Sequence, residues 1–231
     1  MKMNSYISKN YQSIKEQIIN GCDHEVTLIA VSKTKPVVAL QEAYDAGARD
    51  FGENKVQEIM DKYDKLPRDI RWHMIGHLQT NKVKYIADKV YMIQSVDSEK
   101  LAKEISKQAQ KVNRVIPILI EVNIAGEESK FGVNKNDCME LIQNISQLTG
   151  IQVRGLMCVP PFVENEEDNR QYFKALKQLF VDIMQKNIDN VNMDFLSMGM
   201  SGDYMTAIDE GANLVRVGTN IFGARDYSVR A

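Results

Sequence analysis

Short apolar runs alternate with segments of helical periodicity along most of the chain. The opening segment places Ile7, Tyr11, Ile14 and Ile18 on one face of a helix. Eight apolar runs of strand length follow it: VTLIAVS (26–32), ARDFGE (48–53), RWHMIG (71–76), VYMIQSV (90–96), VIPILIEVN (115–123), IQVRGLMCV (151–159), DFLSMGM (194–200) and NLVRVG (213–218). This alternation predicts repeated strand–helix units preceded by an extra N-terminal helix.

The number of units indicates the fold class. The clearest intervening helix is predicted over 165–185, where Phe173, Leu176 and Phe180 belong to one apolar stripe. No linker, low-complexity tract or shift in composition interrupts the repeats, and 231 residues suit an α/β barrel, which typically needs about 250. The sequence therefore predicts one TIM-type (β/α)₈ barrel domain over 1–231. An open, doubly wound sheet is the alternative.

Polar residues that can carry chemistry follow several of the predicted strands. In barrels of this kind the functional groups lie at the carboxyl ends of the strands, so residues after different strands meet at one rim. Lys33 follows the first strand, Asn54 the second, Ser201 the seventh, and the pair Gly218-Thr219 the eighth, two residues after Arg216. We therefore expect these side chains to converge.

Two of these ends pair glycine with a hydroxyl residue, in SGDY (201–204) and GTNIFG (218–223). Glycine allows close backbone approach, the hydroxyl donates a hydrogen bond, and a helix start presents N–H groups to an anion. Side by side, the two corners predict a phosphate site, although Ser201 could instead cap the next helix and Gly218 could make a turn. The glycine patterns of triphosphate and dinucleotide sites are absent from the sequence.

A lysine at a rim that also holds phosphate has a specific chemical use. Its neutral amine can form a Schiff base with a phosphorylated aldehyde. Lys33 is the candidate, whereas Lys35, next to Pro36, is interpreted as a solvated loop charge. Arg216 stands in an otherwise apolar strand and is expected to point into the barrel mouth or to pair with a buried acid.

Composition and charge exclude several classes of protein. Twenty-nine Lys and Arg residues against 31 Asp and Glu residues give a net charge of −2, without a basic block for nucleic acid. No apolar segment has the length of a signal peptide or membrane span, which predicts a cytoplasmic protein with no membrane partner. Cys22, Cys138 and Cys158 are interpreted as reduced thiols. His73 and His77 lack further ligands nearby, so no metal site is predicted, and His73 is interpreted as a hydrogen-bonded core residue.

The chain also resembles a known family. The segments that carry the resemblance are AVSKTKP (30–36), FGENKVQE (51–58), WHMIGHLQTNK (72–82), ESKFG (128–132), RGLMCVPP (154–161), LSMGMSGDY (196–204) and VRVGTNIFGARDY (215–227). They closely resemble the pyridoxal phosphate homeostasis proteins, which are pyridoxal 5′-phosphate (PLP)-binding proteins similar to the N-terminal domain of alanine racemase. The resemblance runs in order from the first strand almost to the end of the chain.

The resemblance implies a role for each candidate residue. Lys33 would hold PLP as a Schiff base, and the phosphate would be bound by Ser201, Gly218 and Thr219. Arg216 would approach the pyridine nitrogen or the phosphate. The family positions that line the pocket correspond here to Asn54, His73, Ser197 and Met198.

The resemblance also implies a function. Alanine racemase has a second, all-β domain that supplies a catalytic tyrosine, and after the eight units only 226–231 remain here. We therefore expect a non-catalytic, monomeric PLP-binding protein of vitamin B6 homeostasis, with PLP-dependent apoenzymes open as recipients of the cofactor. The alternatives are a small PLP-dependent enzyme, such as an amino-acid racemase that uses Tyr204 or Cys158 as a base, and a phosphosugar barrel in which Lys33 acts as in an aldolase.

Overall fold

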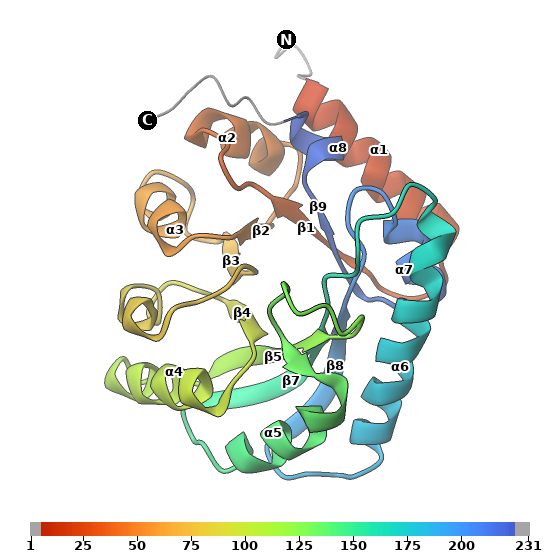
Figure 1. Ribbon diagram of the computed structural model, residues 1–231. Coiled ribbons are helices and arrows are strands. Elements are labelled where there is room, and N and C mark those ends of the chain that lie inside the picture. The colour runs from red at the N-terminus through yellow and green to blue at the C-terminus, as the bar shows by residue number, and fades with distance from the viewer. Residues whose placement is uncertain (1–5, 225–231) are drawn as a thin grey trace.

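Eight parallel strands form a closed barrel in the computed structural model, which describes residues 6–224. The strands are β1 (Thr27–Val31), β2 (Asp50–Glu53), β3 (Arg71–Met74), β4 (Met92–Val96), β5 (Ile116–Asn123), β7 (Ile151–Met157), β8 (Val191–Ser197) and β9 (Leu214–Val217). A pairing of β4 with β5 and one of β1 with β9 complete the ring (Figure 1). Each predicted run overlaps one of these strands, so the TIM-type barrel is confirmed over the open sheet.

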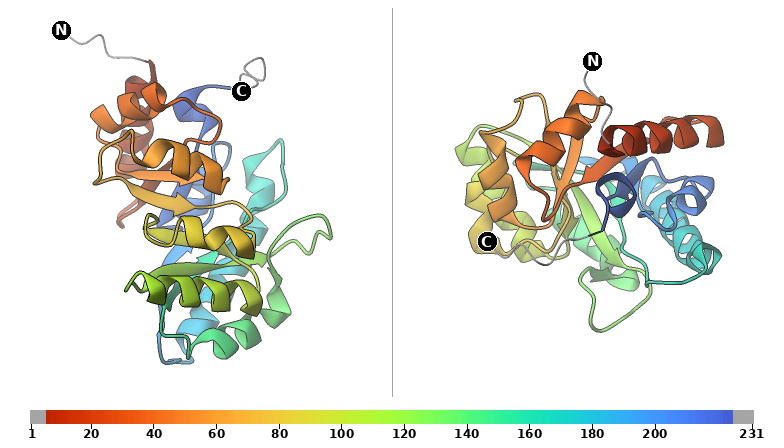
Figure 2. Two further views of the ribbon diagram at one scale, coloured as in Figure 1. Left: turned by 90° about the vertical axis from the view of Figure 1, so that its left-hand side faces the viewer. Right: turned by 90° about the horizontal axis from the view of Figure 1, so that it is seen from above.

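Helices cover the outside of this ring (Figures 1 and 2). They are α1 (Tyr6–Gly21), α2 (Val37–Asp45), α3 (Val56–Tyr63), α4 (Glu99–Lys111), α5 (Cys138–Ile145), α6 (Arg170–Met184), α7 (Tyr204–Asp209) and α8 (Thr219–Phe222), with short 3₁₀ turns η1 (Thr80–Tyr85), η2 (Lys135–Asp137) and η3 (Glu166–Asn169). The helix predicted over 165–185 is therefore η3 followed by α6. A two-residue strand, β6 (Val133–Asn134), pairs with the end of β5.

The N-terminal helix α1 buries the face that the sequence predicts, formed by Ile7, Tyr11, Ile14 and Ile18. It packs beside α2 and α8 on the flank of the barrel (Figure 1). The Tyr6 hydroxyl donates a hydrogen bond of 2.8 Å to the carbonyl of Phe222 in α8. The extra helix therefore holds the segment that follows the last strand.

The barrel interior differs from the layer between strands and helices. The outer layer contains most of the hydrophobic core, whereas the apolar cluster inside the barrel is a single small layer: Ile29, Met92, Leu119, Met157 and Leu214, with Phe195 against it. The rest of the interior includes buried polar side chains, among them Asp50, His73, Gln94, Glu121, Ser197 and Arg216. Since buried polar groups need partners, this interior can position hydrogen-bonding groups.

No helix within residues 6–224 has both the length and the apolar character to cross a membrane. In the left view of Figure 2, the loop between β5 and β6 and the loop between β7 and η3 project from the same side of the barrel.

Candidate functional site at the barrel mouth

A cavity of about 650 Å³ opens at the carboxyl ends of the strands. Six of the nine predicted site residues line it: Lys33, Asn54, Ser201, Arg216, Gly218 and Thr219. They come from the ends of β1, β2, β8 and β9, and β1 pairs with β2 on one side and β9 on the other. The predicted convergence of these residues is therefore found in the fold.

Strand alternation directs Lys33 into the mouth. Ile29 belongs to the inner apolar layer and Val31 lines the cavity, so Lys33 continues the inward-facing row of β1. Ser32 points the other way, and its hydroxyl donates a 2.6 Å hydrogen bond to Glu53 Oε1. Directly after the lysine, Thr34 has a φ of 63°, a left-handed conformation that is strained for a β-branched residue. The lysine thus stands between a strand and a constrained turn.

A buried ionic cluster behind this segment holds the turn. The Lys62 ammonium donates hydrogen bonds to the Ser32 carbonyl at 3.0 Å, and to Glu53 Oε1 and Glu58 Oε2 at 2.8 Å each. Glu58 Oε2 also accepts the Thr34 backbone N–H at 2.6 Å. Burial raises the pKa of Glu53 to about 7, against the opposing effect of the Lys62 ammonium. This cluster fixes the backbone on both sides of Lys33.

Lys35 does not have the role that the sequence suggested for it. Its ammonium donates hydrogen bonds to the carbonyls of Phe222 at 3.1 Å, Gly223 at 3.1 Å and Ala224 at 2.9 Å. The last carbonyls of a helix lack partners within the helix and attract cations, so Lys35 caps α8 instead of remaining a solvated charge. The prediction of a solvated loop charge was wrong.

The two glycine corners are joined directly. The Gly218 N–H donates a 3.2 Å hydrogen bond to Ser201 Oγ, and Asn220 Nδ2 donates to the Ser201 carbonyl at 2.8 Å. Ser201 is not a helix cap, because α7 begins only at Tyr204, with Asp203 at the N-cap position. The predicted pair of corners therefore forms one continuous piece of the rim.

Glycine is required in this rim for a steric reason. Gly199 has a φ of 89°, and a Cβ there would lie 2.6 Å from the Cβ of Ala207. The chain can turn tightly into the serine corner only without a side chain at this position.

The opposite wall of the cavity comes from the loop after β7. Pro161, Phe162 and Val163 line the cavity from this loop, as does Asn169 at the end of η3. Asn169 Nδ2 donates hydrogen bonds to the Pro161 carbonyl at 3.1 Å and to Asp203 Oδ2 at 2.8 Å. Since Asp203 Oδ1 accepts the Met200 N–H at 2.6 Å, the wall is connected to the serine corner.

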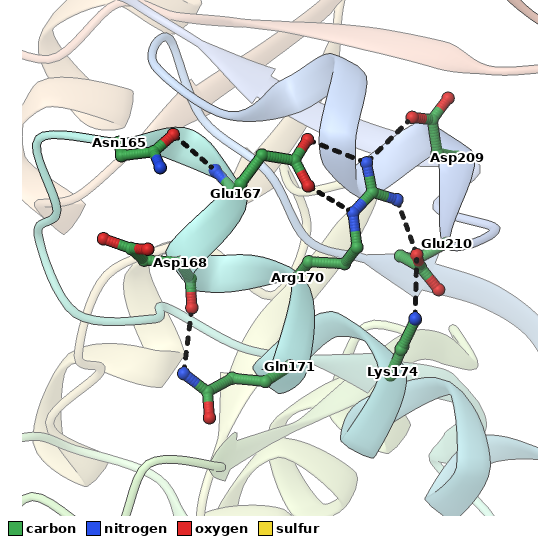
Figure 3. Close-up of polar contacts among 8 residues, drawn as sticks. All are labelled: Asn165, Glu167, Asp168, Arg170, Gln171, Lys174, Asp209 and Glu210. Carbon is green, nitrogen blue, oxygen red and sulfur yellow. Dashed lines mark hydrogen bonds and ion pairs between the residues drawn. The ribbon is translucent and has the colours of Figure 1, made fainter.

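Arg170 reinforces this connection on the outside of the barrel (Figure 3). Its guanidinium donates to Glu167 Oε2 at 2.6 Å, to Glu210 Oε1 at 2.6 Å and to Asp209 Oδ2 at 3.2 Å. Glu167 belongs to η3, whereas Asp209 ends α7 and Glu210 follows it. The arginine thus joins the segment that forms the wall to the helix that follows the serine corner.

Arg216 lies at the base of the cavity and is only 4% exposed. Its Nη1 donates to Ser197 Oγ at 2.6 Å and its Nη2 to the Cys158 carbonyl at 2.7 Å. Burial lowers the pKa of the guanidinium, while negative charge at Glu121 and Asp203 opposes that shift. Of the two roles predicted for Arg216, the structure shows that it points into the mouth.

Three predicted site residues do not line the mouth cavity. Ser197 lies behind Arg216, and Met198 is fully buried. His73 lies near the amino ends of the strands, where it lines a second cavity of about 430 Å³. It is hydrogen-bonded to Asp50 and Gln94, as expected of a core histidine. His73 lies too far from the mouth because it is inside β3, whereas the residue of this segment that lines the mouth cavity, Ile75, follows the end of the strand.

The two residues considered as catalytic bases also lie outside the mouth cavity. The Tyr204 hydroxyl donates to Gln17 in α1 at 2.5 Å. Burial raises the pKa of the Cys158 thiol to about 12. Residues 6–224 contain no group of three or more His, Cys, Asp or Glu side chains placed to hold a metal ion.

Sequence reasoning missed Asn169 and Asp203 as parts of the cavity wall. Asp203 could have been found, because it belongs to the same SGDY motif as Ser201. Asn169 follows an acidic surface run and has no local signal, since only the tertiary fold brings it to the cavity.

Comparison with known proteins agrees with this geometry. The family model of the alanine racemase N-terminal domain matches residues 5–226. A pyridoxal phosphate homeostasis protein of Aquifex aeolicus is 47% identical over 221 residues, which cover 93% of this chain and 96% of that protein. The chain belongs to the pyridoxal phosphate homeostasis protein family. The resemblance found in the sequence motifs is confirmed.

Solved structures related to this family share the barrel. PipY of Synechococcus elongatus PCC7942, solved with PLP bound, is 34% identical with a TM-score of 0.84, over 94% of this chain and all of that chain. An alanine racemase of Clostridium difficile 630 is 13% identical with a TM-score of 0.71, over 94% of this chain but only 60% of that chain. The racemase therefore shares the fold and extends beyond it.

Proposed function

We propose that this family member binds PLP at the barrel mouth as a Schiff base on Lys33 and acts in intracellular PLP homeostasis. One observation carries the proposal: Lys33 lines the same cavity as the joined Ser201–Gly218 corner. An aldehyde that also bears a phosphate needs an amine and a phosphate site at one cavity.

The chemistry of the cavity fits this ligand. The amine of Lys33 would condense with the aldehyde carbon of PLP and release one water molecule. The Ser201 hydroxyl and the Thr219 N–H would bind the phosphate, and the Gly218 N–H, which donates to Ser201 Oγ in the structure, would be shared with it. A glycine corner at a helix start suits an anion. Arg216 adds a positive charge at the base of the cavity. When bound, PLP supplies a ring that withdraws electrons from groups attached to its aldehyde carbon.

A binding role is favoured over catalysis. A racemase needs a second base close to the substrate. Of the two candidates, the Tyr204 hydroxyl donates to Gln17, and the Cys158 thiol is fully buried, which raises its pKa. The relatives at 37–47% identity carry the name of homeostasis proteins. We also propose that the protein is a monomer and lies in the cytoplasm. The free thiols of Cys22, Cys138 and Cys158 support the location, because reduced cysteines are typical of the cytosol. The proposal also includes transfer of PLP to PLP-dependent apoenzymes, which none of the contacts described above addresses.

Two lysine variants test the site. In Lys33→Arg the charge remains but the amine that forms the Schiff base is lost, so no visible absorption band should stay with the protein once unbound PLP has been removed. Lys35→Arg is the matched control, because arginine can still bind the carbonyls at the end of α8, and the band should remain. A band that survives in Lys33→Arg would contradict the proposal.

A further inference from the structure

A continuous chain of buried hydrogen bonds crosses the barrel from its amino end to the cavity at the mouth. Asp50 Oδ1 lies 3.0 Å from His73 Nε2, and His73 Nδ1 lies 3.0 Å from Gln94 Nε2. Gln94 Oε1 accepts the Ser197 hydroxyl at 2.7 Å, and Ser197 Oγ accepts Arg216 Nη1 at 2.6 Å. All five side chains are buried.

The direction of each hydrogen bond in this chain follows from its neighbours. Gln94 can donate to His73 only if Nδ1 carries no proton, so the proton of the neutral imidazole is on Nε2, facing Asp50. The same amide then turns its oxygen toward Ser197, which must donate to it. The lone pairs of Ser197 Oγ are thereby directed to Arg216. A change at Gln94 or His73 therefore reaches the guanidinium through defined partners.

We infer that Gln94 and His73 are positioning residues that orient Arg216 at the PLP site from the opposite half of the barrel. This inference rests on the proposed function. Neither residue lines the mouth cavity, and the hydrogen bonds that connect them to it run through Ser197 and Arg216. The other hydrogen bond of the guanidinium in the structure goes to the main-chain carbonyl of Cys158. Ser197 is thus the only adjustable partner that the structure shows for Arg216 within residues 6–224.

Gln94 is the best position for a test because it stands in the middle of the hydrogen-bond chain, between His73 and Ser197. In Gln94→Met the volume is nearly kept, but both the donor to His73 and the acceptor for Ser197 are lost. The dissociation constant for PLP should rise roughly tenfold, the effect of loosening one hydrogen bond to a charged group. Ser95→Ala is the matched control, since Ser95 is the next residue of β4, is equally buried and has no hydrogen-bond partner for its hydroxyl among residues 6–224. This control should bind PLP as the wild type does.

A double-mutant cycle separates positioning from a general loss of packing. In the Arg216→Met background, Gln94→Met should leave the already weakened PLP affinity unchanged, because no guanidinium remains to be oriented. An equal loss in both backgrounds would show that Gln94 does not act through Arg216 and would overturn the inference. Thermal unfolding of each variant without PLP confirms that folded proteins are compared. If Gln94→Met does not fold, His73→Phe replaces it as the test. This variant should also raise the dissociation constant for PLP, by a smaller factor.

A measurement without PLP checks the chain itself. Nitrogen chemical shifts of the His73 imidazole should show a protonated Nε2 and an unprotonated Nδ1, and the reverse tautomer would contradict the hydrogen-bond directions.

The PLP titrations distinguish failure of this inference from failure of the proposed function. If wild-type protein binds PLP and Gln94→Met binds it equally well, the inference fails and the proposed function stands. If wild-type protein does not bind PLP, both fail.

Discussion

The two ends of the barrel each hold an arginine at a cavity, but the arginines have different partners. At the amino end, Arg71 donates to Asp50 Oδ1 at 2.7 Å and to Oδ2 at 2.5 Å, a bidentate pair that neutralises the guanidinium. At the mouth, Arg216 donates to a hydroxyl and a carbonyl, which are uncharged. A cation beside a cavity is therefore available to an anionic ligand only where no carboxylate has already engaged it. This difference supports the proposal that PLP binds at the mouth.

The largest effect that tests this comparison concerns the two arginines. Arg216→Met removes a buried charge from the cavity proposed to bind PLP. It should raise the dissociation constant for PLP roughly 100-fold, the upper range for a charged hydrogen bond. Arg71→Met should change it less than about twofold, because that charge is already paired with Asp50. PLP titration of both variants measures the contrast. Equal losses would remove the distinction between the two ends.

The second effect is on stability at the amino end. Hydrogen bonds from Arg71 and His73 hold the pKa of Asp50 below its usual value, although burial acts in the opposite direction. A lowered carboxyl pKa stabilises the fold above the unfolded-state pKa near 4, and this contribution is lost as the pH falls through the folded-state value. Asp50→Asn should therefore lower the free energy of unfolding by about 3 kcal/mol at pH 7 and flatten its decline in acid. Urea unfolding at several pH values measures this, and an unchanged acid decline would contradict the assignment.

The third effect concerns Glu121, which lies toward the mouth. Its pKa is raised, whereas that of Asp50 is lowered, so its contribution to stability changes with pH in the opposite direction. Burial, with a smaller contribution from Asp97, raises the pKa of Glu121 to about 7. One of its buried oxygens has no hydrogen-bond partner in the described part of the chain. The folded state then holds the proton more tightly than the unfolded state, so stability falls as the pH rises from about 4.5 through 7. Glu121→Gln should raise the free energy of unfolding by about 1–2 kcal/mol at pH 8 and should have little effect at pH 4. A variant that is less stable than the wild type at pH 8 would show that the ionised carboxylate has a partner.

The smallest expected effect concerns the phosphate corner. Ser201→Ala removes the acceptor of the Gly218 N–H and the proposed donor to the phosphate, but leaves the backbone N–H groups in place. The dissociation constant for PLP should rise about fivefold, as expected for one neutral hydrogen bond. Inorganic phosphate should compete with PLP less effectively in this variant than in the wild type. Unchanged competition would mean that the phosphate lies elsewhere.

The sequence predicted the parts of the structure that depend on strand periodicity. The alternation along 26–32 places Lys33 on the inward-facing row, and the ends of strands 7 and 8 bring Ser201 and Gly218 together because those strands are neighbours in a barrel. It could not predict the depth of His73, since the height of a side chain inside the barrel depends on strand register. Nor could it predict the partners of Lys35, because α8 reaches that lysine only through the closure of β9 onto β1.

The central claim is that Lys33 holds PLP. The most direct test is to incubate the purified protein with PLP, reduce it with borohydride, digest it and map the peptides by mass spectrometry. We predict that the visible band disappears on reduction and that the pyridoxyl-phosphate mass is found on Lys33, with Lys35 unmodified. A protein that takes up no label, or one labelled at another lysine while Lys33 stays unmodified, would contradict the account.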